Sequence, residues 1–296
     1  MRILLVTNKS DHHKYWVTEL CSKFNVVGIC HPQPERRRTT LISRLRERGV
    51  VLTILKLMSA GYHRISSRSF SKTLQKLQPE FFGKASETYD KLPSGLIYAV
   101  NGVNSSESIA KARTLAPDVI CFLGGDIAQK EFLDVAKIAT LNYHSGVSPF
   151  YNGSGTTFAA VADGRPNFCG GTLMVMNERI DGGDILGHYL TPIREEDTAS
   201  SLFLKGIFGA VKLYMLALDR IKETQVRPKG FAQKRSFRYF TSSDWTIYHD
   251  MKLQYFERSG KMKSYRRDEK LFNYSEWDKN LGYPPYFNVL SEILKK

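Results

Sequence analysis

The sequence places an amide, an imidazole and two carboxylates where they could act together. Asn142 and His144 stand two positions apart at the end of a short apolar segment that finishes in LNYH. Side chains two apart on a strand point to the same face, so both would face one spot at a sheet edge. Further along, the turn IDGGDI carries Asp181 and Asp184 between two apolar segments, and it could bring an acid to the same spot.

These groups together suit acyl transfer. The amide and the imidazole can donate hydrogen bonds to a developing oxyanion, and a carboxylate can orient the imidazole or accept a proton. Ser145 could be a nucleophile, but the sequence around it lacks the GxSxG pattern of a nucleophile elbow. A metal site is disfavoured because no second histidine is spaced as a ligand. The alternative interpretation is a structural histidine followed by an ordinary glycine-rich turn.

The elements before this segment predict how it is positioned. Residues 3–7 and 26–30 are expected strands joined by a helix over 13–24, which makes a βαβ opening. Residues 118–123 form a nearly continuous apolar run, typical of a parallel strand buried on both faces. Ligands of such sheets bind beyond the carboxyl ends of the strands, where 142–155 would lie. We therefore expect a Rossmann-like, doubly wound α/β fold with a mostly parallel sheet.

Other segments set the expected domain organisation. Helical apolar spacing over 37–58 is interrupted at Gly49, and the polar stretch 61–95 suggests one short helix. A long amphipathic helix should run over 196–222, opening at Asp197 or Thr198. The basic, aromatic tail predicts a small α+β subdomain, so we expect one domain over 1–192 and a second unit over 193–296.

Composition narrows the class of protein. In 296 residues, 42% are hydrophobic and 24% are charged, which is typical of a globular chain. The sequence contains no run of about 18 apolar residues, so no membrane span is predicted. The four cysteines form no CxxC pair, and we expect reduced thiols in a cytoplasmic protein.

The net charge of +14 favours anionic partners. Basic clusters occur at Arg36–Arg38 with Arg44, Arg46 and Arg48, and at Lys261, Lys263, Arg266 and Arg267.

Two stretches together resemble a known family. They read NYHSGVSPFYNGSGTTFAAVADG and GGTLMVMNERIDGGDIL, and the upstream segment reads APDVICFLGGDIAQKEFLD. This pattern is similar to that of the N10-formyltetrahydrofolate-dependent formyltransferases, closest to the branch that acts on nucleotide-linked amino sugars. The resemblance covers about residues 95–190 well, the first 30 more loosely and the tail hardly at all.

The resemblance implies roles residue by residue. Asn142, His144 and Asp181 match the family's catalytic Asn, His and Asp. We expect the pterin ring of the formyl donor to be held by Gly125, Asp126, Ile127 and Ala128 on one side, and by Glu178, Ile180 and Asp181 on the other. We expect Ser145, Tyr151 and Asn152 to contact the acceptor. The chain departs from the pattern at Asn152, where many relatives have Arg, and at Met174, where several have His.

The family implies an activity and leaves the acceptor open. We expect a transfer of the formyl group of N10-formyltetrahydrofolate to a primary amine, most favourably on a nucleotide-linked amino sugar. Methionyl-tRNA formyltransferase and formyltetrahydrofolate hydrolase are the alternatives, and a module that only binds folate is a third. A homodimer is possible, tRNA is a less favoured partner, and no membrane partner or metal is expected.

Overall fold

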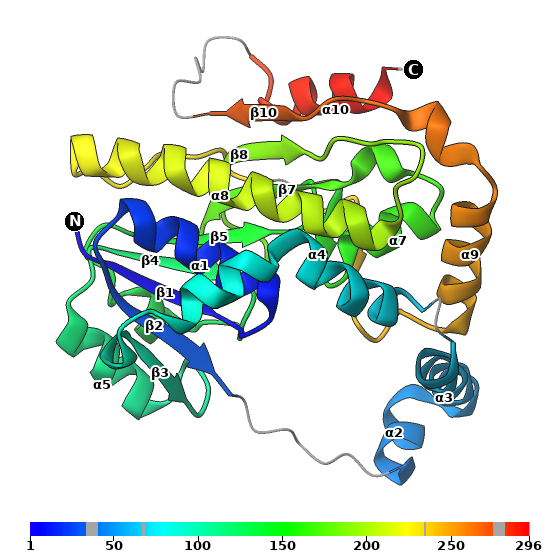
Figure 1. The fold of residues 1–296 in the computed structure, drawn as a ribbon, viewed down its shortest axis with the longest axis horizontal. Helices are drawn as coiled ribbons and strands as arrows, with labels where there is room; N and C mark the ends of the chain where they lie inside the picture. The colour runs from blue at the N-terminus through cyan, green and yellow to red at the C-terminus, as the bar shows by residue number, and fades with distance from the viewer. Residues whose placement is uncertain (34–40, 67–68, 234, 275–281, 296) are drawn as a thin grey trace.

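The computed structural model describes residues 1–33, 41–66, 69–233, 235–274 and 282–295, with side chains of the second range described from Leu45 onward. Arg36–Arg38, part of the first basic cluster, lie outside this description. The described residues form an eight-stranded sheet in the order β10-β8-β7-β5-β4-β1-β2-β3 (Figure 1). Its strands are β1 (Ile3–Thr7), β2 (Val26–Pro32), β3 (Ile97–Val100), β4 (Val119–Leu123), β5 (Ala139–His144), β7 (Gly170–Val175), β8 (Asp184–Leu190) and β10 (Lys270–Asn273).

Strands β1 to β5 are parallel, and the central strands β1 and β4 are buried on both faces. Alternate side chains of β1 enter different cores: Ile3 and Leu5 belong to one cluster, Leu4 and Val6 to the other. Helices α1 (Asp11–Lys23) and α8 (Ala199–Thr224) cover the first face. Helices α5 (Ser106–Leu115) and α6 (Lys130–Leu133) cover the second. Helices on both faces of a mostly parallel sheet confirm the doubly wound fold predicted from the sequence.

The other side of the sheet is antiparallel. β5 pairs with β7, β7 with β8, and β8 with β10. The turn between β7 and β8 carries the IDGGDI segment, and the pairing places Asn142 opposite Met174. The sheet therefore changes direction at β5, the strand that ends in His144.

Helix α8 is hydrogen-bonded to two central strands of the sheet. Its Tyr214 hydroxyl donates to the carbonyl oxygens of Phe122 on β4 and Leu141 on β5, at 2.6 and 3.2 Å. Thr198 caps the helix through a reciprocal pair of hydrogen bonds with Ser201, which confirms the predicted start. By length and composition α8 could cross a membrane, but more than half of its apolar window is buried in the molecule, so it is the core helix of this fold.

Two helices differ from the prediction or refine it. α4 (Phe70–Asp90) runs for 21 residues rather than as one short helix, because its Phe82 packs with Leu204 and Ile207 of α8 in a small separate core. The predicted interruption at Gly49 is confirmed, since it separates α2 (Leu41–Arg48) from α3 (Val50–Ile65) with a φ of +77°. Short 3-10 helices lie at Ser94–Leu96, Pro166–Phe168 and Lys261–Tyr265.

The tail does not pack as a separate unit. β10 joins the main sheet, and β9 (Arg238–Phe240) pairs in parallel with β6 (Tyr151–Gly153) in a second, small sheet of the described residues. Helix α9 (Ile247–Arg258) packs against α7 (Thr156–Ala162), and α10 (Tyr286–Leu294) contributes Val289 to the same core cluster. The boundary expected near residue 192 therefore does not coincide with a break in the core.

The four cysteines are free, in agreement with the predicted reduced thiols. Cys30, Cys121 and Cys169 are buried, and Cys21 is half-buried on α1. Burial raises the pKa of the Cys21 and Cys30 thiols to about 11, so both are thiols rather than thiolates at neutral pH.

Candidate active site

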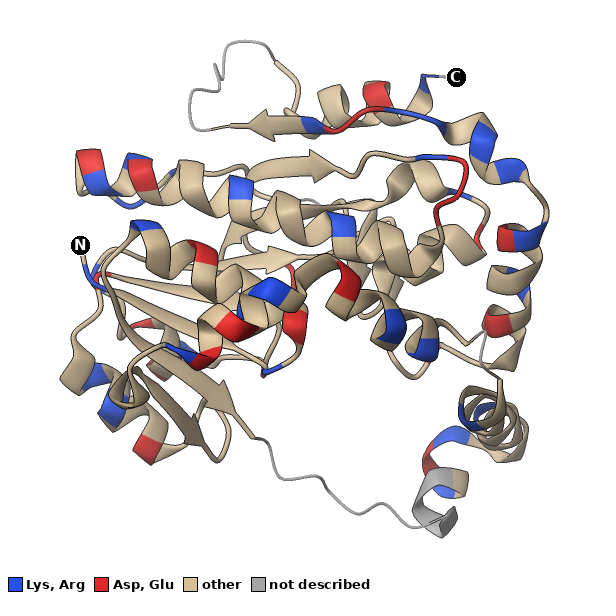
Figure 2. Ribbon diagram, viewed as in Figure 1, with Lys and Arg blue, Asp and Glu red and all other residues tan. Residues whose placement is uncertain are grey.

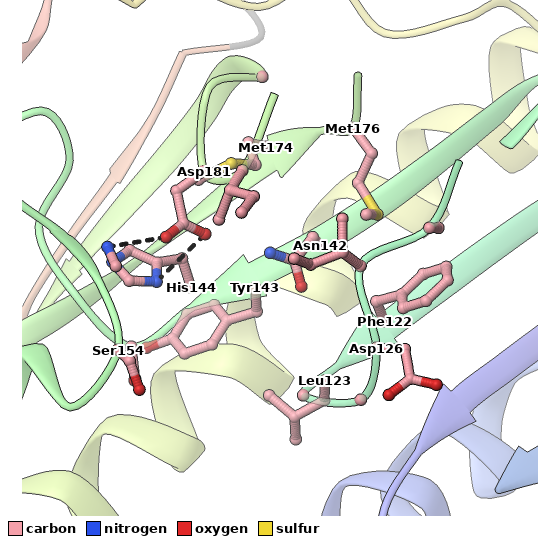
Figure 3. A pocket seen from close by; sticks show the side chains of 18 of the residues that line it. Phe122, Leu123, Asp126, Asn142, Tyr143, His144, Ser154, Met174, Met176 and Asp181 are labelled. Atoms are coloured by element: carbon pink, nitrogen blue, oxygen red, sulfur yellow. Dashed lines mark hydrogen bonds and ion pairs between the residues drawn. The ribbon is translucent and has the colours of Figure 1, made fainter. Parts of the chain in front are cut away.

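The predicted imidazole and acid lie side by side. His144 ends β5, and its Nδ1 is 3.4 Å from Oδ1 of Asp181, which comes from the β7–β8 turn (Figure 3). The two side chains are only 6% and 9% exposed. The other carboxylate oxygen of Asp181 accepts a hydrogen bond of 2.9 Å from the backbone N–H of Gly153. The carboxylate is thus fixed against one ring nitrogen of His144.

The second nitrogen of His144 is also engaged. Its Nε2 lies 3.1 Å from the carbonyl oxygen of Tyr151. A carbonyl can only accept, so this contact places a hydrogen on Nε2 and leaves Nδ1 facing Asp181. Gly146 makes the arrangement possible, because a Cβ there would overlap both His144 Nε2 and Tyr151 O. The loop after β5 therefore locks the plane of the ring.

Asn142 supplies the amide expected from the strand period. It lies two residues before His144 on β5, and its side chain lines the same cavity (Figure 3). Within the described residues, no side-chain hydrogen bond to its amide is present. The amide is therefore available to a molecule in the cavity, which makes it a ready donor to an oxyanion.

These three residues form the floor of a cavity of about 620 Å³. One wall is the loop after β4, residues 124–128, where Gly124 and Gly125 adopt φ values of +70° and +96°. The facing wall is the segment 176–181, and Phe203 and Ile207 of α8 close one side. Apolar walls with a few convergent polar groups are typical of a small-molecule site.

The loop after β4 presents its backbone to this cavity. In the described part of the chain, no protein group accepts from the backbone N–H groups of residues 125–128. Asn104 braces the loop by donating to Ile127 O at 2.8 Å and accepting from Gln129 N at 2.7 Å. A rigid loop with free backbone donors fits the edge of a flat, polar heterocycle. The carboxylate of Asp126 is itself engaged by Val103 N at 3.3 Å.

Most of the predicted site residues meet here. The cavity is lined by Gly125, Asp126, Ile127, Ala128, Asn142, His144, Ser145, Glu178, Ile180 and Asp181. Tyr151 and Asn152 do not line it. The Tyr151 hydroxyl donates to Asp163 at 3.2 Å, in a separate cavity behind β6. Asn152 instead donates to the backbone oxygen of Asp181 at 3.2 Å, so it supports the turn from outside the cavity.

Several residues of the site were not predicted from the sequence. His12 and His13, at the start of α1, line the cavity, and burial lowers the pKa of both. They follow the carboxyl end of β1, a position at which a ligand site could have been expected. Gln233, far along the chain, donates to Gly183 O at 2.7 Å and so braces the Asp181 turn. No local signal points to Gln233, because its contact joins distant segments.

A second cavity adjoins the first on the outer side of the same turn. Its volume is about 600 Å³, and it shares Arg179, Ile180, Asp181 and Tyr239 with the first cavity. Arg235, Ser236 and Phe237 line its far end. Phe237 is 74% exposed, and its ring stacks on Phe150 at 5.5 Å. Asp181 therefore lines both cavities, the second of which is cationic and aromatic.

Fold and site together define a doubly wound α/β protein with an acyl-transfer type of site at the carboxyl end of β5. A family model described as "Formyl transferase" matches residues 57–218, which is more than half of the chain. The chain therefore belongs to the formyl transferase family, and the family resemblance seen in the sequence is confirmed.

Curated relatives match over part of their length. Methionyl-tRNA formyltransferase of Lysinibacillus sphaericus is 31% identical over 123 residues, which are 41% of this chain and 37% of the relative. Methionyl-tRNA formyltransferase of Lactobacillus johnsonii is 32% identical over 129 residues, which are 43% of this chain and 38% of the relative. The match thus spans well under half the length of these relatives.

Solved structures share the fold. A sugar N-formyltransferase from Shewanella sp. has a TM-score of 0.52 at 15% identity, covering 86% of each chain. An N-formyltransferase from Helicobacter canadensis, in complex with folinic acid and dTDP-3-aminofucose, has a TM-score of 0.50 at 16% identity and covers 87% and 81%. Glycinamide ribonucleotide transformylase 1 from Symbiobacterium toebii has a TM-score of 0.50 at 15% identity. The match covers 79% of this chain and 94% of that structure. At these identities the likeness is one of fold.

Proposed function

We propose that this protein transfers a formyl group from N10-formyltetrahydrofolate to a primary amine. The observation that carries the proposal is the Asp181 carboxylate 3.4 Å from His144 Nδ1, beside the free Asn142 amide, on the floor of one cavity. Family membership supports the same reaction class. The Helicobacter canadensis relative was solved with a folate derivative, which supports the choice of donor for this chain.

The first cavity suits the donor. Its loop 124–128 offers backbone donors to a pterin edge, and Ile180 and Phe203 offer apolar contact to a flat ring. We assign Gly125, Asp126, Ile127 and Ala128 to one side of the ring, and Glu178, Ile180 and Asp181 to the other. Bound N10-formyltetrahydrofolate would supply the one-carbon group as a formyl carried on nitrogen.

The chain's own groups then perform the transfer. The Asn142 amide donates to the formyl oxygen as negative charge develops there. Both ring nitrogens of His144 face protein groups, so His144 adds to this stabilisation through the positive charge that it gains with the amine's proton. The new bond joins the amine nitrogen to the formyl carbon, and the bond from that carbon to N10 breaks. The amine loses one proton, which the His144–Asp181 pair accepts and returns to the departing N10. The Tyr151 carbonyl and Gly153 N–H keep this pair in place.

The acceptor that we favour is a nucleotide-linked amino sugar. The second cavity supports it, because Arg179 and Arg235 can face a diphosphate while the exposed Phe237 ring can stack on a base. Its inner end reaches Asp181, where the amine has to arrive. Asn152 lines this second cavity and Ser145 lines the first, so both stay our candidates for contact with the acceptor, while Tyr151 lines a separate cavity. We place the reaction in the cytoplasm, where folate donors and nucleotide sugars are made.

Methionyl-tRNA is the second candidate acceptor. The curated relatives at 31–32% identity carry that activity in their names. The net charge of +14 would also suit a nucleic acid. In that case the second cavity would receive the aminoacyl end of the RNA, and Arg179 and Arg235 would face its phosphates.

The test is a mass-spectrometric transfer assay. The protein is mixed with N10-formyltetrahydrofolate and, in separate reactions, with dTDP- and GDP-linked amino sugars, methionyl-tRNA and glycinamide ribonucleotide. We expect one amino-sugar nucleotide to gain a formyl group, and the gain to disappear in His144→Ala. Formate release without any acceptor would identify a hydrolase instead. Folate binding with neither product would overturn the proposed transfer.

A further inference from the structure

Helices α2 and α3 form a projecting arm at one end of the molecule (Figure 1). One face of α3 is apolar and exposed. Positions three, four and seven apart on a helix share a face. Six aliphatic side chains follow this spacing and are between 49% and 87% exposed: Val50, Val51, Ile54, Leu57, Met58 and Ile65. We call these six residues the arm stripe.

Contacts on the opposite face of α3 fix the direction of the stripe. The Ser59 hydroxyl donates to Asp250 Oδ2 on α9 at 2.5 Å, and His63 Nε2 lies 3.0 Å from the other oxygen of the same carboxylate. Lys56 donates to Ser242 O at 2.8 Å. Asp250 is 2% exposed, so this anchor is internal. The arm stripe therefore points outward as a consequence of specific contacts and not of a loose helix.

The arm stripe would be stabilised by a surface that covers it. Exposed aliphatic side chains that occur singly are ordinary, but six on one helix face form a patch, and such patches mark interaction surfaces. Burying an aliphatic side chain is worth about 1.5–3 kcal/mol, so six together represent a substantial gain for any surface that covers them.

The charge of the arm restricts what that surface can be. Between residues 41 and 65 the chain has Arg44, Arg46, Arg48, Lys56 and Arg64, and its only acid is Glu47. Figure 2 shows blue segments along the arm with a single red one. Arg46 and Arg48 are exposed in the last turn of α2, next to the start of the arm stripe. The covering surface should therefore be apolar inside and anionic at its edge.

We propose that the arm docks on an anionic lipid surface, with the arm stripe in the acyl boundary and Arg46 and Arg48 at the headgroups. A basic amphipathic helix that lies in the membrane plane has this distribution of residues. The helix of 16 residues is about 24 Å long and can lie flat on such a surface. The contact is peripheral, so it requires no membrane-spanning segment.

Other occupants fit less well. A second copy of the chain, paired through this face in either direction, would bring arginines against arginines with only Glu47 to offset them. A nucleic acid would be matched by the charge, but it would leave six aliphatic side chains in water, and the stripe has no aromatic ring for stacking on bases. A lipid surface satisfies both the apolar stripe and the charge.

The experiment is sedimentation of the full chain with vesicles of phosphatidylcholine, with and without phosphatidylglycerol. The stripe variant is Ile54→Asn with Met58→Asn, and its control is Val226→Asn, a similarly exposed aliphatic residue beyond α8. The charge variant is Arg46→Gln with Arg48→Gln, and its control is Lys91→Gln with Lys222→Gln, two exposed lysines elsewhere. Unfolding curves of all variants show whether each one folds.

We expect the wild type and both controls to bind the anionic vesicles. Binding should fall more than about tenfold in the stripe variant and about fivefold for each arginine removed. Equal binding to neutral and anionic vesicles, or no binding to either, would overturn the proposal. So would a dimer that dissociates in the stripe variant, or tRNA binding that depends on the arginines while vesicles do not bind. None of these readouts depends on formyl transfer.

Discussion

Asp181 occupies a backbone conformation that few residues with side chains adopt. Its φ is +48°, and aspartate and asparagine are among the residues that tolerate this region. One carboxylate oxygen is held by Gly153 N and the other faces His144, so the geometry of the turn sets the direction of the acid. The role of Asp181 in the site therefore depends on which neighbour each of its two carboxylate oxygens contacts.

The first prediction concerns the charge of Asp181. Asp181→Asn keeps the size, the acceptor for Gly153 N and the tolerated φ, but it removes the proton acceptor beside His144. On the proposed function we expect kcat to fall about 10²–10⁴-fold, with donor binding retained. Asp184→Asn is the matched control in the same turn, because Asp184 is exposed at the start of β8. Steady-state kinetics and folate fluorescence titration measure the two effects. Normal turnover in Asp181→Asn would remove this residue from the mechanism.

The second prediction concerns the amide of Asn142. Asn142→Ala removes the free donor on the cavity floor, and we expect a loss of about 10²–10³ in kcat. Asn142→Asp should lose at least as much, because its negative charge would face the developing oxyanion. The measurement is single-turnover transfer with saturating donor, which separates chemistry from binding. If Ala and Asp retain full rates, the oxyanion must be stabilised by other groups.

At the scale of elements, local signals predicted much of what surrounds the site. β1 follows from its apolar run, and the start of α8 follows from Thr198, whose side chain accepts from Ser201 N. The strand period correctly put Asn142 and His144 on one face. The length of α4 did not follow, because it depends on packing against α8. The tail's strands did not either, because β10 meets β8 some 80 residues away in the chain.

The third prediction tests a brace between elements. Gln233 donates to Gly183 O at 2.7 Å and accepts from Asn152 at 3.3 Å, and Asn152 in turn donates to Asp181 O. Gln233→Ala should let the Asp181 turn shift, and a small misplacement of a catalytic group is costly. We expect kcat to fall about tenfold, while the free energy of unfolding falls only by about 1 kcal/mol. The conservative Gln233→Glu keeps the acceptor for Asn152 and loses the donor to Gly183 O. If Gln233→Glu turns over normally, the donor to Gly183 is not what positions the turn.

At the scale of the whole molecule, a buried histidine links three distant segments. His188 on β8 donates from Nε2 to Ser148 O, in the loop after β5, and accepts at Nδ1 from the Tyr274 hydroxyl, next to β10, both at 2.7 Å. The side chain is fully buried, and burial lowers its pKa from 6.5 to about 4. The bond from Tyr274 requires the neutral ring, because a protonated Nδ1 carries a hydrogen and cannot accept; the bond to Ser148 O exists in either state.

The last prediction follows from this pKa. Between pH 6.5 and 4 the unfolded chain binds a proton at His188 and the folded chain does not, so the free energy of unfolding falls as the pH falls. The loss from His188 should be on the order of 3 kcal/mol across this window. Burial lowers the pKa of His12 and His13 as well, and their contributions have the same sign. Urea unfolding at a series of pH values measures the slope. His188→Gln removes the titrating ring, so we expect a lower stability at pH 7 but a shallower decline toward pH 4. Parallel declines in the variant and the wild type would assign the acid sensitivity to other groups, with the histidines at the cavity wall as the next to test.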